Sequence, residues 1–144
     1  MTEKEHFNAE GAKFAQRSQK ETNDLSHAVI GAAMDVQRAL GVGLLESAYS
    51  AALAIELTER GMGFEREAPM TAIYKGRPLG LAYRADFVVE GSLIVEIKAI
   101  EAVGEMHRAQ LLSYLRVSGL KLGLLINFHT FPLAKGIHRI VNQL

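Results

Sequence analysis

The strongest constraint on the fold is a pair of short apolar segments joined by turn-forming residues. Leu81–Val89 and Leu93–Ile97 are rich in residues that favour strands, and Glu90-Gly91-Ser92 lies between them. We interpret the two segments as a β-hairpin. A three-residue loop, in which glycine can take a positive φ, pairs Val89 with Leu93. A two-residue turn would instead shift the register by one position and reverse the faces of one strand.

The register decides where the charged residues of this hairpin meet. Side chains alternate between the faces of a strand, so Glu96 and Lys98 share one face of theirs, as Arg84 and Asp86 do of the preceding strand. With the three-residue loop, Asp86 lies directly across from Glu96, and Arg84 lies across from Lys98. The opposite face of the hairpin is then apolar and carries Tyr83, Phe87, Val89, Leu93, Val95 and Ile97.

Two interpretations of the charged face remain open. It can be a solvated sheet face on which the charges form cross-strand salt bridges, as antiparallel sheets allow. It can also be a metal site, because Mg²⁺ binds through one or two carboxylates and keeps several waters. Lys98 would then orient a water molecule or stabilise charge on a phosphate. Arg84 would either contact a phosphate or neutralise Asp86.

The remaining segments predict an α/β protein with a mixed central sheet flanked by helices. Helices are expected at Ser26–Leu40, at about residues 44–60 and at Glu105–Val117, where Gly119 ends the last one. Phe64–Tyr74 predicts one or two short strands, and residues 75–78 predict a turn. Leu122–Phe128 is an apolar run typical of a buried strand, and Ile137–Val141 is an expected edge strand. The order is helix, helix, three strands, helix, strand and a short last strand.

Composition limits the kinds of chemistry and the compartment. The 144 residues fit one domain, in which we expect residues 1–24 to be a mobile polar arm, with a frayed helix near Ala9–Gln19, and residues 25–144 to fold. The absence of cysteine excludes disulfides, thiolate metal sites and cysteine nucleophiles, and it fits a reducing cytoplasm. No long apolar run or secretory signal is present, so we expect a cytoplasmic protein without a membrane partner.

Charge is unevenly distributed along the chain although the net charge is zero. Residues 106–144 contain no Asp or Glu, but they contain Arg108, Arg116, Lys121, Lys135 and Arg139. These cations either steer a phosphate backbone or scatter over a solvated surface. His107, His129 and His138 lack the spacing of metal ligands, so we interpret them as surface residues or phosphate neighbours.

Several motifs in the correct order resemble a known family. Asp86, followed after a short hairpin by Glu96-Ile97-Lys98, resembles the D…ExK signature of the PD-(D/E)XK nuclease superfamily. The segment from Gly43 through Glu46 to Tyr49 is similar to the motif of its GxxExxY branch. The similarity continues through residues 109–115 and 123–128, and it covers roughly residues 25–141. In one departure, Ala85 stands where the signature has proline.

The resemblance implies a restriction-endonuclease-like core and roles for individual residues. Asp86 and Glu96 would be metal ligands, Lys98 the catalytic lysine, and Glu46 the helical acid that completes the metal shell. Gln110 and Tyr114, four positions apart on one helix face, would correspond to a Q-x-x-x-Y motif that contacts nucleic acid. Considered alone, Glu46 could be an acid that the helix dipole favours in the first turn, and Tyr49 could be a core aromatic residue.

These observations favour an enzyme that hydrolyses phosphodiester bonds of DNA or RNA with Mg²⁺ or Mn²⁺. Arg84 and Arg108 are the expected phosphate contacts, beside Gln110 and Tyr114. The alternative is a catalytically silent module with the same fold that binds or assembles with a partner. The apolar last strand is compatible with a homodimer or a protein partner. Neither a hydrolase serine motif nor a phosphate-binding P-loop is present.

Overall fold

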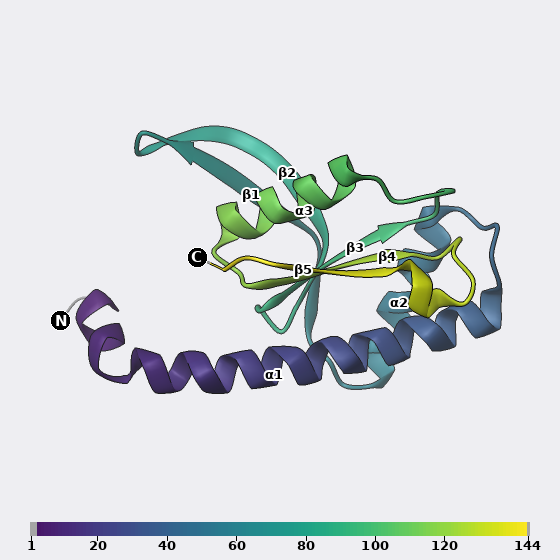
Figure 1. The fold of residues 1–144 in the computed structure, drawn as a ribbon, viewed down its shortest axis with the longest axis horizontal. Coiled ribbons are helices and arrows are strands. Elements are labelled where there is room, and N and C mark those ends of the chain that lie inside the picture. Colours follow the sequence, from purple (N-terminus) through teal and green to yellow (C-terminus); the bar gives the residue numbers. More distant parts are fainter. Residues whose placement is uncertain (1–2, 144) are drawn as a thin grey trace.

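A long first helix and two shorter helices surround the sheet in a computed structural model of the chain (Figure 1). The structure describes the backbone of residues 3–143 and the side chains of residues 19–80 and 83–143. The helices are α1 (Glu3–Leu40), α2 (Glu46–Glu59) and α3 (Glu105–Ser118). Much of the expected polar arm therefore lies outside the residues whose side chains are described, and its mobility stays a prediction.

The predicted start of the first helix at Ser26 is wrong, because α1 begins well before it. Ser26 does not cap a helix end. Its hydroxyl is buried, donates to the carbonyl of Asn23 at 2.8 Å and accepts from Arg139 at 2.9 Å. Arg139 also donates to the Asn23 side chain at 2.9 Å. These hydrogen bonds dock α1 against the last strand.

Five strands form one mixed sheet, as predicted. They are β1 (Phe64–Tyr74), β2 (Arg77–Val89), β3 (Leu93–Lys98), β4 (Leu122–Asn127) and β5 (Ile137–Val141). The spatial order follows the sequence, β1-β2-β3-β4-β5. Only β3 and β4 run parallel, and α3 makes the crossover between them. Parallel strands are usually covered on both faces, and both of these are almost fully buried.

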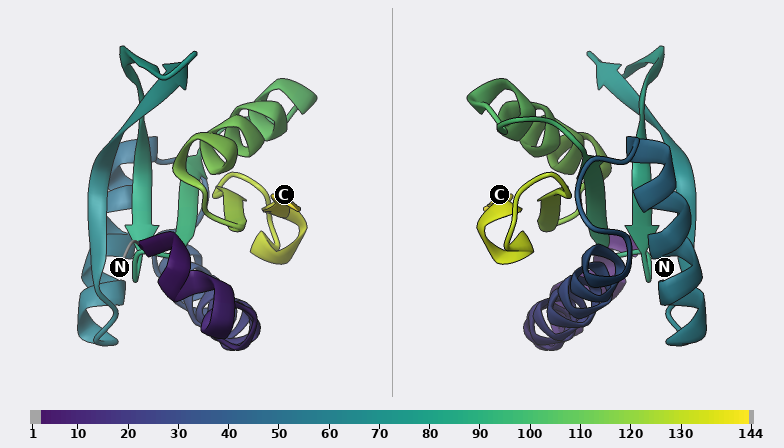
Figure 2. Two further views of the ribbon diagram at one scale, coloured as in Figure 1. Left: turned by 90° about the vertical axis from the view of Figure 1, so that its left-hand side faces the viewer. Right: turned by 90° about the vertical axis from the view of Figure 1, so that its right-hand side faces the viewer.

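Two apolar clusters hold the layers together on opposite faces of the sheet, and Figure 2 shows the helices that cover it. On one face, Val36 of α1 and Leu53 of α2 belong to the cluster that contains Phe87, Val95 and Leu124. On the other face, α3 packs through Leu111 and Leu115 over Ile94, Ala85 and Leu125. Each fully buried aliphatic side chain contributes roughly 1.5–3 kcal/mol through removal from water. These clusters fix β3, which carries Glu96 and Lys98, at the centre of the fold.

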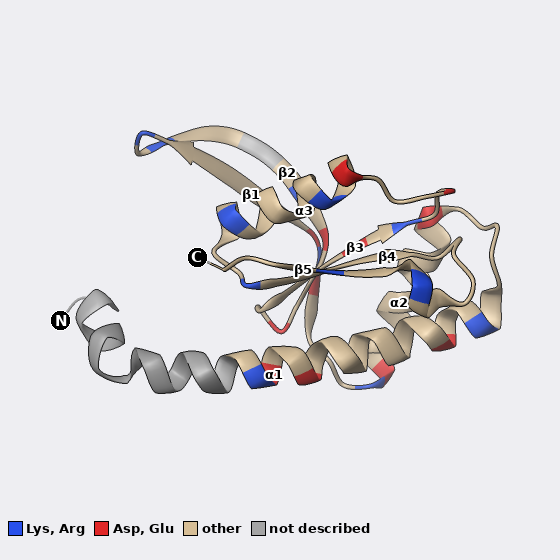
Figure 3. Cartoon of the chain, viewed as in Figure 1, with Lys and Arg blue, Asp and Glu red and all other residues tan. Residues whose placement is uncertain are grey.

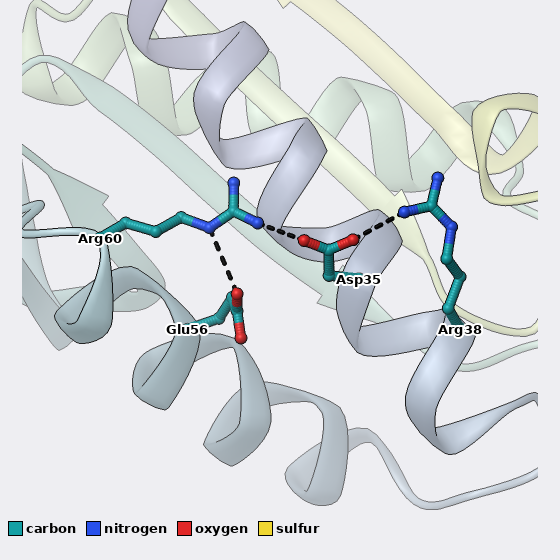
Figure 4. A network of polar contacts seen from close by, with 4 residues as sticks. All are labelled: Asp35, Arg38, Glu56 and Arg60. Atoms are coloured by element: carbon teal, nitrogen blue, oxygen red, sulfur yellow. Dashed lines mark hydrogen bonds and ion pairs between the residues drawn. The ribbon is translucent and has the colours of Figure 1, made fainter.

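Charged side chains join α1 to α2 on the surface (Figure 4). Asp35 of α1 pairs with Arg38, at 2.7 Å, and with Arg60, which follows α2. Arg60 also contacts Glu56 at 3.3 Å. Exposed ion pairs of this kind contribute about 0–1 kcal/mol each, so apolar packing supplies most of the attachment. The network lies at the end of α2 opposite Glu46.

The hairpin between β2 and β3 has the predicted three-residue loop. Val89 pairs with Leu93, and the next two pairs continue in the same register. The amide of Ser92 donates to the Val89 carbonyl at 3.0 Å, and Gly91 has a φ of +63°. No helix among the described residues is long and apolar enough to cross a membrane.

Candidate active site

Asp86 and Glu96 meet where β2 and β3 separate. The ladder between the strands runs from Val89–Leu93 to Phe87–Val95. Beyond it, side chains replace backbone pairing: the Ile97 amide donates to Asp86 Oδ2 at 2.8 Å, and the Asp86 amide donates to Glu96 Oε1 at 3.3 Å. The two carboxyl groups therefore lie together, as the register predicted. The expected backbone pairing of Arg84 with Lys98 is not part of the ladder.

A local irregularity in β1 lies opposite Asp86. Arg66 pairs with Phe87 and Ala68 pairs with Ala85, but Glu67 between them has a φ of +49° and no partner in the ladder. Ala85 belongs to the cluster under α3, whereas Phe87 belongs to the cluster under α1 and α2. The side chains of β2 therefore switch from one face of the sheet to the other at Asp86.

This change of facing corrects one part of the predicted sorting. Tyr83 was expected on the apolar face with Phe87, and that assignment is wrong. Tyr83 packs on the α3 side, where its ring stacks on Tyr114 with an interplanar angle of 13°. Strict alternation fails here, because Ala85 and Phe87, two positions apart, belong to apolar clusters on opposite faces of the sheet. Tyr83 thus joins the wall of the site, a place that its sequence position did not indicate.

Burial and the neighbouring carboxyl make Glu96 electrostatically unusual. Glu96 is nearly buried, with 7% of its surface exposed. Burial raises the pKa of Glu96 to about 8, and the charge and hydrogen bonding of Asp86 act in the same direction. The Asp86 amide and Lys98 act in the opposite direction but do not outweigh these effects. Strongly shifted carboxyl groups of this kind are typical of functional sites.

Glu46 and Lys98 complete the group of charges. Glu46 is the first residue of α2, and its carboxyl interacts electrostatically with Lys98 and Asp86 and bonds to the backbone at Ala99. Burial and the charge of Asp86 raise the pKa of Glu46 against the opposing effect of Lys98. Lys98 ends β3, and its carbonyl accepts from the Phe128 amide at 2.8 Å. The structure thus brings together Glu46, Asp86, Glu96 and Lys98.

The sequence from Gly43 to Tyr49 has a structural explanation. The Tyr49 ring is fully buried and stacks on Phe128 with centroids 4.6 Å apart. Its hydroxyl donates to the Gly41 carbonyl at 2.7 Å and accepts from the Leu44 amide at 3.2 Å. Tyr49 is therefore a core aromatic residue with a satisfied hydroxyl, as its pattern suggested. It anchors the loop immediately before Glu46 and so holds that carboxylate at the sheet.

The other predicted substrate contacts divide into near and distant residues. Tyr114 lies near both acids, since burial and the charges of Glu96 and Asp86 raise its pKa. Gln110 is exposed on the same helix. Arg84 is exposed and pairs with Pro69 in the β1–β2 ladder. Arg108 is exposed and contacts His138 Nδ1 at 3.1 Å, away from the carboxyl groups.

The three C-terminal histidines have local structural partners. His107 Nδ1 accepts from the Gly104 amide at 3.1 Å at the start of α3. His129 Nε2 lies 3.0 Å from the Leu44 carbonyl. Burial and the charge of Arg108 lower the pKa of His138. None of these contacts involves Asp86 or Glu96.

The donor set fits a hard divalent cation. Asp86 and Glu96 bring two carboxyl groups together in a mostly buried gap, where burial and the neighbouring Asp86 oppose the ionisation of Glu96. Uncompensated buried carboxylates are costly, and a bound Mg²⁺ or Mn²⁺ would relieve that cost. Across the described side chains, however, no three acids or histidines already stand in metal-binding geometry. A cation would therefore have to draw Glu46 closer.

Comparison with known proteins agrees with this geometry. The model of the PD-(D/E)XK nuclease superfamily matches residues 23–140, a range that contains all four charged residues of the site. No curated protein and no solved structure shows a significant match. The mixed sheet flanked by helices is consistent with a restriction-endonuclease-like fold. The chain belongs to the PD-(D/E)XK nuclease superfamily.

Proposed function

We propose that the protein is a nuclease that hydrolyses phosphodiester bonds of nucleic acid with Mg²⁺ or Mn²⁺. The observation that carries the proposal is the meeting of two carboxyl groups, Asp86 and Glu96, in the gap between β2 and β3. Lys98 lies on the same strand as Glu96, and its charge acts on both Glu96 and Glu46. A nuclease-superfamily fold supports this combination.

Each residue has a distinct proposed part in the reaction. Asp86 and Glu96 would hold the cation, with Glu46 as a third ligand, and the bound ion would activate water and neutralise phosphate charge. The Lys98 ammonium would donate hydrogen bonds to the attacking water or to a phosphate oxygen. Tyr114 and Gln110 would shape the substrate side of the site. Arg84 and Arg108 would contact phosphates farther away.

A catalytically silent binding or assembly module is the second candidate. One observation favours it: the described acids and histidines include no ready-made group of three for a metal ion. In that case the raised pKa of Glu96 would leave it protonated near neutral pH, and Asp86 could be stabilised by the Ile97 amide alone. The two candidates differ in metal binding and therefore can be separated by titration.

The decisive experiment measures metal binding and cleavage on the same variants. We expect Mn²⁺ to give a calorimetric signal and a thermal shift with the wild type, and Asp86→Asn to lose both. Lys98→Met should still bind Mn²⁺ but lose cleavage of labelled DNA or RNA. Glu59→Gln, an exposed change on α2, is the matched control. A wild type that neither binds Mn²⁺ nor cuts either substrate would favour the silent module.

The finer assignments are also proposals. Gly43, Glu46 and Tyr49 support membership of the GxxExxY branch. The proposal of Mg²⁺ or Mn²⁺ rests on the oxygen donors alone, which suit both ions. We further propose that residues 25–144 form the catalytic domain and that the protein acts in the cytoplasm, since it lacks cysteine. A homodimer or a protein partner remains compatible with the apolar residues of β5.

A further inference from the structure

The paired strands β1 and β2 extend well beyond the rest of the sheet. β3 pairs with β2 only from Phe87 to Val89, whereas β1 and β2 pair as far as Tyr74 and Arg77. Residues 69–84 therefore form a two-stranded ribbon, here called the outer ribbon, which projects away from the sheet (Figures 1 and 2). Among its described side chains, support comes at the base, where Tyr83 stacks on Tyr114 of α3.

The tip of the outer ribbon exposes apolar side chains. Ile73 is 69% exposed, Tyr74 is 61% exposed and Leu79 is 63% exposed. A two-stranded hairpin without a covered face is marginally stable in water. The tight turn is nevertheless well defined, because Lys75 and Gly76 both have positive φ, as the favoured two-residue turn requires. A well-formed but uncovered apolar tip is typical of a surface that binds something.

Charge identifies what kind of partner the tip would meet. From Ala68 to Ala85 the chain contains Lys75, Arg77 and Arg84 but no Asp or Glu. Figure 3 shows the basic positions at the tip, with the acidic positions of the same hairpin near its base. Lys75 lies with its ammonium 5.5 Å from the centre of the Tyr74 ring. A basic tip with apolar flanks complements an anionic groove rather than another neutral protein surface.

The dimensions of the outer ribbon match duplex DNA. Ten positions separate Gly76 at the tip from Asp86 in the candidate site. At about 3.3 Å per residue, the tip lies roughly 30 Å along the strand from the acids. One turn of B-form DNA is about 34–36 Å long, and its major groove, about 12 Å wide, admits a two-stranded ribbon. A ribbon starting at the scissile phosphate would reach the next turn of the same duplex.

We propose that the outer ribbon is a clamp for double-stranded DNA, with its tip in the major groove about one turn from the site of cleavage. Lys75 and Arg77 contact phosphates at the rim of the groove, and Ile73 and Leu79 contact base edges. This inference rests on the proposed function, because the duplex must enter at Asp86 and Glu96. A-form RNA has a major groove too deep and narrow for the ribbon, so duplex DNA is the substrate class.

The test measures binding without cleavage. Fluorescence anisotropy of a labelled 30-base-pair duplex is followed in EDTA across a salt series, with the full chain. Replacing both cations, in Lys75→Gln/Arg77→Gln, should reduce the slope of log affinity against log salt by about 1.8 and weaken binding at 0.1 M salt by roughly tenfold to a hundredfold. Lys20→Gln/Arg38→Gln removes the same charge from exposed positions on α1 and should leave the slope nearly unchanged.

The apolar residues require a separate variant. Ile73→Ser/Leu79→Ser should weaken duplex binding while keeping the salt slope, because no charge is removed. Circular dichroism and the melting temperature check that each variant folds. If this variant changes the molar mass in light scattering while duplex binding stays intact, the tip is an interface between copies and the clamp is refuted. Equal binding of duplex RNA and duplex DNA would also overturn it.

The outcome separates this inference from the proposed function. If wild-type protein cuts DNA with Mn²⁺ but the Lys75/Arg77 variant binds and cuts as well as wild type, the clamp is wrong and the nuclease stands. If the wild type cuts nothing but binds duplex through Lys75 and Arg77, the clamp stands and the nuclease fails. Where both hold, the variant should raise KM for duplex DNA and leave kcat unchanged at saturation.

Discussion

Replacing Glu96 with glutamine should change how the stability of the metal-free protein depends on pH. Glu96 is nearly buried beside Asp86, and burial raises its pKa to about 8. Glutamine keeps the size and hydrogen-bonding capacity of the protonated carboxyl but cannot ionise. Glu96→Gln therefore removes one titration from the folded state and leaves the packing around it nearly unchanged.

Because folding raises the pKa of Glu96, the folded protein should lose stability as the pH rises. A carboxyl whose pKa is higher in the folded than in the unfolded protein stabilises the fold while it is protonated in both states. That contribution is complete below the unfolded value, near 4.5, and is lost as the pH rises through about 8. At about 1.36 kcal/mol per pKa unit, the loss reaches roughly 4–5 kcal/mol. This is a large share of a typical domain stability of about 5–15 kcal/mol.

Urea unfolding in EDTA at several pH values between 5 and 9 measures this effect. The free energy of unfolding of the wild type should fall with pH relative to that of Glu96→Gln, and the two should converge near pH 5. Glu59→Gln, at an exposed position, should follow the wild type throughout. Addition of Mn²⁺ at pH 8 should restore the wild type but not Glu96→Gln. A difference that stays constant from pH 5 to pH 9 would refute the reasoning.

Three further predictions concern the stability of the fold. Tyr49→Phe should lower the free energy of unfolding by about 1–2 kcal/mol in urea denaturation, because two backbone groups lose their hydroxyl partner. Gly136→Ala should destabilise more than Gly123→Ala, because its new Cβ would lie 2.7 Å from the carbonyl oxygen of Asn127, whereas at Gly123 it meets a side chain; equal melting temperatures would contradict this. Asp35→Asn should cost less than about 1 kcal/mol despite its two ion pairs, and a larger loss in the same assay would show that the network is stronger than exposed pairs usually are.

The sequence was informative where structure depends on neighbouring residues. The register of the β2–β3 hairpin follows from a three-residue loop, and that register brings Asp86 to Glu96. Helix α3 was predicted from its apolar spacing. Its end at Gly119 was predicted because glycine readily takes a positive φ, which is +76° here. The mixed sheet follows from the buried run in β4.

Other features depend on partners distant in the chain. The twist that moves Tyr83 to the α3 side arises opposite Glu67, whose positive φ has no sequence signal, because it is neither glycine nor asparagine. The start of α1 was misplaced at Ser26, whose buried hydroxyl bonds to Asn23 and to Arg139, more than a hundred residues later. The approach of Glu46 to the strands was implied only by the family resemblance, since periodicity cannot position a helix against a sheet.

The amide protons of the two parts of the candidate site should exchange with solvent at different rates, because one part lies on the central strand β3. Glu96 and Lys98 pair with Leu125 and Asn127 of the fully buried strand β4, so their amide protons should exchange slowly with solvent. Glu46 begins α2 after Leu45, which provides no side-chain cap, and such a first turn frays at little cost. A cation bound to both halves would therefore slow hydrogen exchange mainly at the beginning of α2, where the unliganded protein has the most freedom to lose.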